Sequence, residues 1–487
     1  MNTQRAPGTG SLLFVLLAGV FFTLLNTSIV NVMLPKLMDE FAISAPTAQW
    51  LSTGFLLTSG IVFMLVPYLS KRHQYKTLFS SAMVFLVAGS LICAAAPSFP
   101  VMFAGRLVQA VGYGLVLPLA MILVLAITPA EKRGVNMGIL GIGMMLAPAF
   151  GPTLAGVSLS TIGWRALFVI LSVGGAAVLG LTLVTFRYRN EQQPAQLDGA
   201  GVILSAMGLS SLLYGISSAG DKGWAHTDVI VPIAAGIGLL VGFAVVELRK
   251  TTALLDLRVF KDRGFASSVI VTMALQMAFY GGLILMPIYF EMVMGYSGLR
   301  TGLLLLPGSV LIGAVGVVSG KLYDKIGIKP LAITGTLVMA ATAVFLARIT
   351  PETSAVQACL TYTVFALGVA IVMTPLSTAA FATVPPKQNS DAVTLQNTLR
   401  QIAGSIGMAV LITAMSTSAH RYATNLGGAV TPQTPLLAAN HGITTAFILT
   451  VVLCLFATVL SLFLASGKKD VSPQTEVSPV LETSGVK

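Results

Sequence analysis

The chain has 487 residues, of which 55% are hydrophobic and 9% are charged, and its formal net charge is +11 at pH 7. A soluble domain carries about 25% charged residues, so this composition excludes a soluble globular protein and indicates a polytopic membrane protein. The basic residues lie in short loops between apolar segments, which argues against a nucleic-acid partner and predicts membrane topology instead.

Fourteen apolar segments are long enough to cross a bilayer, for which about 20 residues are needed. In chain order they cover residues 11–34, 47–69, 77–96, 99–127, 135–157, 166–186, 200–219, 229–248, 265–290, 299–320, 329–348, 355–381, 394–417 and 443–465. The first segment does not read as a cleavable signal peptide, because its apolar run is too long and it lacks a cleavage site of small residues.

The distribution of basic residues predicts the orientation of these segments. If the N-terminus is cytoplasmic, the inner loops hold 20 of the Lys and Arg residues and the outer loops hold 6. This bias predicts that both termini face the cytoplasm and that the chain is a multi-pass protein of the cell membrane. Residues 467–487 are rich in Ser, Thr, Pro and Val and are predicted to be a disordered cytoplasmic tail.

An internal repeat indicates how the segments are grouped. The loop at residues 320–331 reads GKLYDKIGIKPL and the loop at residues 67–78 reads PYLSKRHQYKTL, and each follows the second span of a six-span block. Parallel repeats of this kind place a binding site near the midplane between two halves. We therefore predict a six-helix bundle at 1–190, a two-helix middle insertion at 191–260, a second six-helix bundle at 261–466 and the tail.

The fifth apolar segment is unusually rich in small residues and proline. Residues 141–156 read GIGMMLAPAFGPTLAG, in which a small residue recurs every fourth position from Gly143 to Ala155. Such a face lets another helix approach closely, and prolines are tolerated where neighbouring helices satisfy the freed backbone groups. Pro148 and Pro152 predict a kink. The segment is either a packing seam of a membrane bundle or a bending helix of a transporter that changes shape.

Several motifs resemble one family of transporters. The stretch APAFGPTLAG matches the antiporter motif of span five, GRLVQAVGYG at 105–114 resembles the span-four motif around a buried arginine, and NTSIVNVMLP at 26–35 resembles the span-one motif. GKLYDKIG at 320–327 is a good copy of the superfamily loop motif. Over nearly its whole length the chain resembles the fourteen-span drug:proton antiporters of the EmrB/QacA type in the major facilitator superfamily, nearest the lincomycin-resistance-type branch.

The resemblance implies an all-α polytopic membrane protein with the major facilitator fold, made of two six-helix bundles and two additional helices. It implies secondary active multidrug efflux, and hence antibiotic resistance, by alternating access in exchange for protons. The antiporter motif then comprises Gly143, Pro148, Gly151, Pro152 and Gly156. Export or flipping of a lipid or metabolite with weak or relocated proton coupling is the alternative. An embedded enzyme is disfavoured, because we find no metal-ligand cluster, nucleophile motif or phosphate loop and expect no cofactor.

Two departures from the family pattern bear on mechanism. Many relatives carry Asp in span one where this chain has Asn26, and Asn cannot carry a proton. In the first loop motif the usual Asp is Lys71, so that half of the cytoplasmic latch is predicted to be weakened or rebuilt. The carboxylate that would carry the proton is therefore unassigned.

Arg106 is the outstanding charged residue of the apolar segments. It is predicted to lie at a depth similar to that of Asn26, where an arginine costs at least a few kcal/mol unless it is paired or hydrated. It is either a structural anchor or the group that couples substrate or proton binding to closure. Without a carboxylate nearby, backbone carbonyls, Gln109 or water must satisfy its guanidinium.

Three other charged residues bear on the mechanism. Glu291 at the outer end of span nine is either a solvated interfacial residue or a carboxylate that takes over the proton role. Arg400 near the inner end of span thirteen can snorkel to the interface. Asp324 of the second loop motif is predicted to form a state-dependent latch.

The predicted substrate cavity combines aromatic, methionine and amide side chains, which adapt to varied lipophilic ligands, although such stripes also occur as packing or lipid-facing surface. Its predicted members are Phe22, Asn26, Phe55, Gln109, Met144, Gln276 and Tyr280. Few acids lie near the midplane, which favours neutral, weakly basic or anionic amphiphiles over multivalent cations. The expected partners are small lipophilic substrates, protons and the lipid bilayer, and the chain is compatible with a monomer.

Overall fold

The structure is a computed structural model that describes residues 9–43, 45–129, 132–186, 188, 190, 192, 198–250, 255–385, 388–425 and 434–464. Over these residues the chain forms fourteen long α-helices, a short 3-10 helix and a π-helical turn, with no strand. The helices are α1 (Thr9–Phe41), α2 (Ala45–Arg72), α3 (Tyr75–Ala94), α4 (Phe99–Ile127), α5 (Arg133–Thr161), α6 (Trp164–Thr185), α7 (Gly199–Lys222), α8 (Thr227–Arg249), η2 (Leu257–Lys261), α9 (Arg263–Ile288), η3 (Tyr289–Val293), α10 (Gly298–Ile326), α11 (Ile328–Leu346), α12 (Ala355–Ala382), α13 (Asn389–Asn425) and α14 (Thr434–Leu462).

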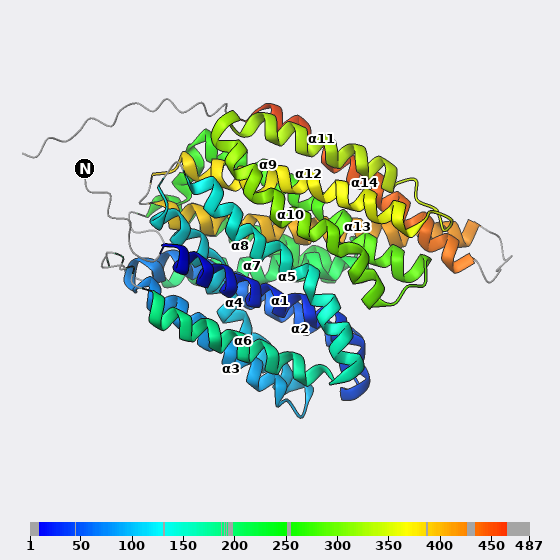
Figure 1. The fold of residues 1–487 in the computed structure, drawn as a ribbon, viewed down its shortest axis with the longest axis horizontal. Helices are drawn as coiled ribbons and strands as arrows, with labels where there is room; N and C mark the ends of the chain where they lie inside the picture. Colours follow the sequence, from blue (N-terminus) through cyan, green and yellow to red (C-terminus); the bar gives the residue numbers. More distant parts are fainter. Residues whose placement is uncertain are drawn as a thin grey trace, which may run out of the picture.

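The helices run back and forth along one long bundle (Figure 1). Thirteen of the helices in the described part are long and apolar enough to cross a membrane. The remaining long helix is α5, within which several side chains lie outside the described part. The predicted all-α, polytopic fold is therefore confirmed. We name the end of the bundle where α1 begins and α14 ends the inner end, because the basic loops predict that it faces the cytoplasm, and the opposite end the outer end.

Two groups of helices meet along a seam. Helices α1 to α6 pack against one another in the lower part of Figure 1, and α9 to α14 pack against one another in its upper part. Across the seam α5 packs against α10, and α13 packs against α2 and α4. The α7–α8 hairpin also lies at the seam, since α7 contacts both α2 and α13.

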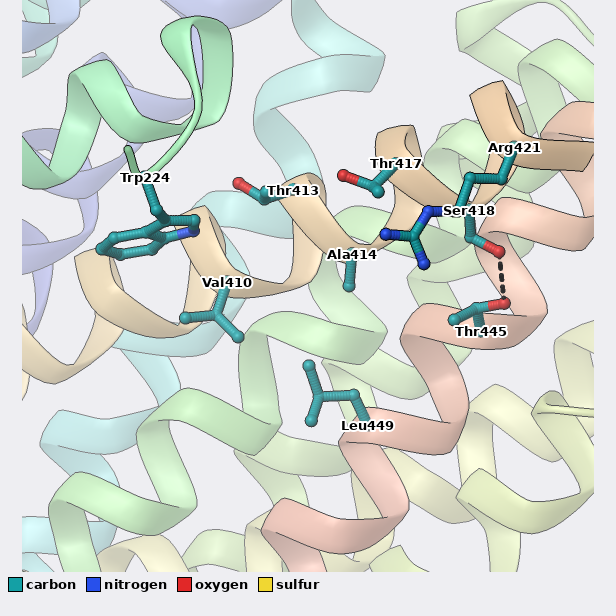
Figure 2. A pocket seen from close by; sticks show the side chains of 9 residues that line it. All are labelled: Trp224, Val410, Thr413, Ala414, Thr417, Ser418, Arg421, Thr445 and Leu449. Atoms are coloured by element: carbon teal, nitrogen blue, oxygen red, sulfur yellow. Dashed lines mark hydrogen bonds between the residues drawn. The ribbon is translucent and has the colours of Figure 1, made fainter. Parts of the chain in front are cut away.

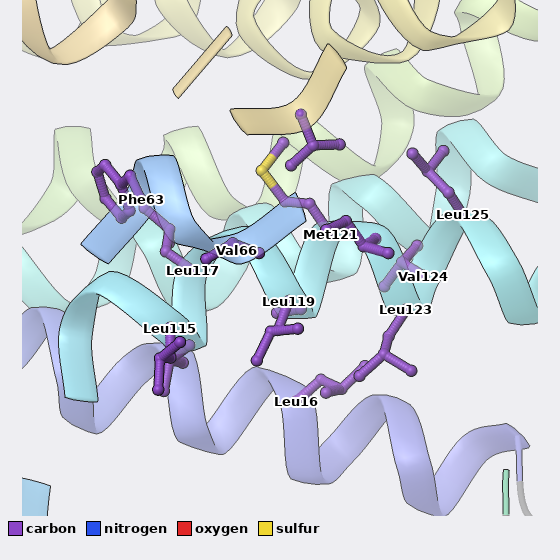
Figure 3. Packing of buried hydrophobic residues seen from close by; sticks show 14 of the residues in the cluster. Leu16, Phe63, Val66, Leu115, Leu117, Leu119, Met121, Leu123, Val124 and Leu125 are labelled. Carbon is purple, nitrogen blue, oxygen red and sulfur yellow. The ribbon is translucent and has the colours of Figure 1, made fainter. Parts of the chain in front are cut away.

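Helix α4 lies at the centre of the hydrophobic core. Every residue from Gly114 to Leu125 is buried, so this part of the helix has no face open to lipid or water. Figure 3 shows Leu115, Leu119 and Leu123 pointing toward the neighbouring α1, while Met121 points away from it. A helix that is apolar on all sides is typical of the middle of a bundle. This position holds the polar residues of α4 between several neighbouring helices.

Helix α5 joins the two halves through its glycines. Its inner turn places Gly134 and Gly138 against the backbone of α10, where a Cβ atom would lie 2.6 Å from the Gly320 oxygen and 2.7 Å from the Gly316 oxygen, respectively. These four residues form the glycine contact. Backbones approach this closely only where neither helix carries a side chain. The glycine contact therefore closes the inner end between α5 and α10.

We expect Gly134→Val to open the inner end, because its side chain cannot fit against α10 without separating the two helices. A spin-label distance between exposed positions 73, directly after α2, and 325 on α10 should lengthen. Gly180→Val on α6 is the matched control, since no atom lies within 4 Å of its Cβ position. An unchanged distance in the Gly134 variant would show that the glycine contact does not hold the two halves together.

Candidate functional site

A buried arginine on α4 forms the centre of a polar cluster. Arg106 is 1% exposed. Its Nη1 donates to Asn26 Oδ1 of α1 at 2.9 Å and to Gln109 Oε1 at 2.8 Å. Gln109 in turn donates through Nε2 to Ser90 Oγ of α3 at 2.8 Å. Hydrogen bonds to a charged donor are stronger than neutral ones, so the arginine fixes three helices relative to one another.

An aromatic ring of α2 covers the same guanidinium. The Arg106 Cζ atom lies 4.3 Å from the centroid of the Phe55 ring. This is a cation–π contact, which is strongest where water is excluded. Phe55 packs edge-on against Tyr113, whose ring centroid is 5.2 Å away. Together Asn26, Phe55, Ser90, Arg106 and Gln109 form what we name the Arg106 cluster, and three of them were predicted members of the cavity.

The Arg106 cluster leaves polar atoms unused. Within the described residues, Arg106 Nε and Asn26 Nδ2 are buried and have no hydrogen-bond partner. The same part of the chain provides no carboxylate ion pair for Arg106. A buried donor without a partner costs about 1–3 kcal/mol, so these two groups favour binding an acceptor. The cluster therefore presents positive charge and free donors rather than a proton-carrying acid.

A second arginine lies on the other side of the seam. Arg400 Nη2 of α13 donates to Asn397 Oδ1 at 3.1 Å. The phenol groups of Tyr113 and Tyr280 lie close enough to interact electrostatically with the Arg400 guanidinium. The ring of Tyr280 on α9 packs against Gly404 of α13, and a Cβ atom on Gly404 would lie 2.6 Å from that ring. Arg400 begins the fourth turn of α13 and bonds within its own helix. The interpretation that it snorkels to the inner interface is therefore not needed.

The remaining predicted cavity residues divide between the two regions. Gln276 is buried on α9, one turn before Tyr280. Phe22 of α1 packs where a Cβ of Gly174 on α6 would lie, so it belongs to packing inside the first half. Met144 is half-buried beside the core of the same half. The structure thus brings Asn26, Phe55 and Gln109 to one site and does not bring Phe22 there.

The predicted antiporter motif of α5 faces α1. A Cβ on Gly143 would lie 2.9 Å from the Leu17 oxygen, and one on Gly151 would contact the Ser28 side chain. Gly156 is half-buried near the outer end of the helix. The side chains of Pro148 and Pro152 lie outside the described part of the structure. The small residues of the motif therefore bring α1, which carries Asn26, close to α5.

A charged contact closes the inner end between α2 and α13. Lys71 Nζ lies 3.6 Å from Asp391 Oδ2, and the side chains are 33% and 2% exposed, respectively. The Asp256 amide donates to Asp391 Oδ1 at 3.4 Å, and Gln388 Nε2 donates to Asp256 Oδ2 at 2.6 Å. We name these four residues the charge latch. Asp391 also lies in the first turn of α13, where the helix dipole favours a negative charge.

The charge latch shows how the first loop motif is rebuilt. In the second half, Asp324 near the end of α10 lies beside the first turn of α5. Its Oδ1 is 3.4 Å from the position that a Cβ atom on Gly134 would take. An acid there faces the positive end of a helix dipole. The first half carries Lys71 at the equivalent place, and α13 supplies the acid instead. Asp391 was not predicted from the sequence, although an acidic residue at the start of an apolar segment is a recognisable pattern.

Glu291 lies apart from both regions. It is exposed in the π-helical turn η3 at the outer end of α9. No described contact joins it to the Arg106 cluster. Within the described side chains, the buried carboxylates are Glu247 and Asp391, both of which lie at the inner end. This arrangement favours the simpler reading of Glu291 as a solvated interfacial residue.

A cavity of about 430 Å³ opens at the outer end between the α7–α8 turn, α13 and α14 (Figure 2). Its lining comprises Trp224, Val410, Thr413, Ala414, Thr417, Ser418, Arg421, Thr445 and Leu449. Figure 2 shows Trp224 and Arg421 on opposite sides of it, with hydroxyl groups between them. None of the predicted cavity residues lines it, so it is separate from the Arg106 cluster.

Comparisons with known proteins give a consistent result. The family model described as "Major Facilitator Superfamily" matches residues 16–408. The chain is 41% identical to an MFS-type transporter, YhcA, of Bacillus subtilis (strain 168), over 84% of this chain and 77% of that protein. It is 35% identical to the lincomycin resistance protein LmrB of Listeria monocytogenes, over 93% of this chain and 96% of that protein.

The fold also resembles solved transporters. The structure of the human organic anion transporter MFSD10 (TETRAN) matches with a TM-score of 0.64 at 13% identity, over 93% of this chain and 99% of that one. At this level of identity the likeness concerns the arrangement of the helices alone.

Proposed function

The chain belongs to the major facilitator superfamily of membrane transporters, and from this premise we propose that it exports lipophilic or amphiphilic compounds across the cell membrane in exchange for protons. Export is suggested by the relatives named for lincomycin and multidrug resistance. In this proposal the inner end faces the cytoplasm, and α1 to α6 move against α9 to α14 to expose the central site alternately to each side.

The Arg106 cluster carries the proposal. It is buried between α1, α2, α3 and α4, it combines a cation with an aromatic ring, and it holds donors that have no partner in the described structure. Arg400 adds a second cation from the other half. Two cations without a neighbouring acid repel a dication and attract electron-rich groups. We therefore propose neutral, weakly basic or anionic amphiphiles as substrates.

Closure of the inner end supports alternating access. The glycine contact and the charge latch seal α5 against α10 and α2 against α13 at the same end. In both places a residue at the end of one helix meets the first turn of a helix from the other half. Such polar and backbone contacts can separate without exposing a large apolar surface, so they suit an interface that opens and closes.

We expect uptake of a neutral lipophilic compound into inside-out membrane vesicles to depend on an acidic lumen. Collapse of the pH gradient with an ionophore should reduce uptake to the passive rate, because proton exchange supplies the driving force. A lipophilic dication is expected to be a poor substrate in the same assay. Uptake that is independent of the gradient would contradict proton exchange, and preference for the dication would contradict the proposed substrate class.

The variant Glu291→Gln extends this test to the outer end. Because Glu291 is exposed and lies apart from the Arg106 cluster, we expect its coupling to match that of the exposed-loop control Glu352→Gln. Loss of coupling in the Glu291 variant alone would instead assign the proton role to this carboxylate.

A further inference from the structure

Two carboxyl groups meet at the inner end of the α7–α8 hairpin. Glu247 in the last turn of α8 is 2% exposed, and the Asp198 side chain at the N-terminus of α7 is 8% exposed. A Cβ atom on Gly201 would lie 2.5 Å from Glu247 Oε1 and 3.0 Å from Asp198 Oδ2. Both carboxyl oxygens therefore approach the same point, so the two side chains are direct neighbours. We name Asp198 and Glu247 the carboxyl pair.

The surroundings assign different states to the two acids. Asp198 caps α7 by accepting from the Gly201 amide at 3.0 Å and pairs with Lys250 Nζ at 2.5 Å. Burial acts to raise the pKa of Asp198, but the Gly201 amide, Lys250 and the neighbouring Glu247 outweigh it, so its pKa is lowered. Glu247 Oε2 accepts only the Leu255 amide among the contacts described for that atom, at 3.2 Å. Asp198 is therefore the ionised member.

Two neighbouring carboxyl groups beside a single ammonium group favour retaining one proton, because the ammonium balances only one negative charge. With one proton the pair and Lys250 are neutral in sum, whereas without it they leave a net negative charge in a buried place. Two close carboxylates cannot both ionise without cost, so the proton is bound by the pair as a unit. Among the described charged residues near this region, Asp256 caps η2, and Arg258 of η2 donates through Nη2 to the Leu248 and Lys250 carbonyls. Arg249 in the last turn of α8 is exposed.

Consecutive backbone amides link the carboxyl pair to the charge latch. The Leu255 amide donates to Glu247, and the next amide, that of Asp256, donates to Asp391. A shift of Glu247 is therefore transmitted through one peptide unit to the acid that pairs with Lys71. This contiguity joins the two-helix insertion to the seam between the halves.

We propose that Asp198 and Glu247 form a proton-binding site on the inner side that controls the charge latch. Release of the shared proton makes the two carboxylates repel each other, separates the ends of α7 and α8, and withdraws residues 255–256 from Asp391. The inner end then opens more readily at alkaline inner pH. This control of gating is additional to the proposed export and lies outside the central site.

Infrared titration of the purified protein in lipid nanodiscs tests the site directly. We expect the C=O stretch of one protonated carboxylic acid to persist at neutral pH and to disappear in both Glu247→Gln and Asp198→Asn. These variants preserve the shape, and Asn remains a good N-cap for α7. The control Glu352→Gln should retain the band. If Glu247→Gln and wild type have the same carboxylic acid bands at neutral pH, the shared proton does not exist.

A spin-label distance between His73→Cys and Lys325→Cys, with the native cysteines replaced by serine, tests the control of the latch. We expect the distance to lengthen as pH rises through the titration of the band, and the response to vanish in Glu247→Gln. An identical pH response in Glu247→Gln and wild type would overturn the control. Neither readout involves transport, so both can succeed if proton-coupled export fails.

Discussion

Arg106→Ala should lower substrate efflux at least tenfold while the protein remains folded in the membrane. The substitution removes the charged donor to Asn26 Oδ1 and Gln109 Oε1, and it removes the cation above Phe55. A tenfold effect corresponds to about 1.4 kcal/mol, which is within the range of one charged hydrogen bond. Efflux of a lincosamide from proteoliposomes, together with its binding affinity, measures the loss.

Lysine distinguishes charge from geometry at this position. Arg106→Lys keeps the positive charge but loses the planar guanidinium that lies over Phe55 and whose Nη1 donates to two acceptors, so we expect intermediate efflux. Arg165→Ala is the matched control, because Arg165 is an exposed arginine that pairs with Glu40 at the outer end. If Arg106→Ala loses thermal stability but retains normal efflux, Arg106 is a structural anchor and not part of the transport site.

Local sequence patterns predicted the parts of this site that lie within single helices. The spacing of Arg106 and Gln109 places both on one face of α4, and the structure joins them. Matching Asn26 to the depth of Arg106 followed from helical rise alone. The small residues of α5 also predicted a close helix contact, which the structure places against α1. These features depend on periodicity and length, which the sequence contains directly.

The missing parts depend on contacts between distant segments. The ion pair of the charge latch joins positions 71 and 391, and no local pattern relates them. The carboxyl pair is similar, because Asp198 and Glu247 meet only when α7 and α8 form a hairpin. The position of this hairpin at the seam could not be predicted from the sequence either, because the composition of an apolar span does not specify which helices pack against it. The resemblance to the family predicted that Lys71 disturbs the first loop motif, but it did not predict which acid pairs with Lys71.

Lys71→Met should open the inner end more than Asp391→Asn does. Loss of Lys71 leaves a carboxylate that is 2% exposed without its cation, whereas loss of the acid leaves a lysine that is 33% exposed and can turn to water. Unpaired buried charge is costly, and partial exposure of Lys71 reduces the effect to about 1–2 kcal/mol. The spin-label distance between positions 73 and 325 measures the open population, with the exposed Lys321→Met as control.

The double variant turns this asymmetry into a test of the charge latch itself. Lys71→Met combined with Asp391→Asn leaves neither residue of the ion pair charged, so the inner end should be less open than in Lys71→Met alone. The Asn side chain can still accept from the Asp256 amide, which keeps the link to the α7–α8 hairpin. Neighbouring residues that interact give non-additive effects, whereas independent ones add. Simple additivity of the two single variants would therefore show that the pair does not hold the inner end closed.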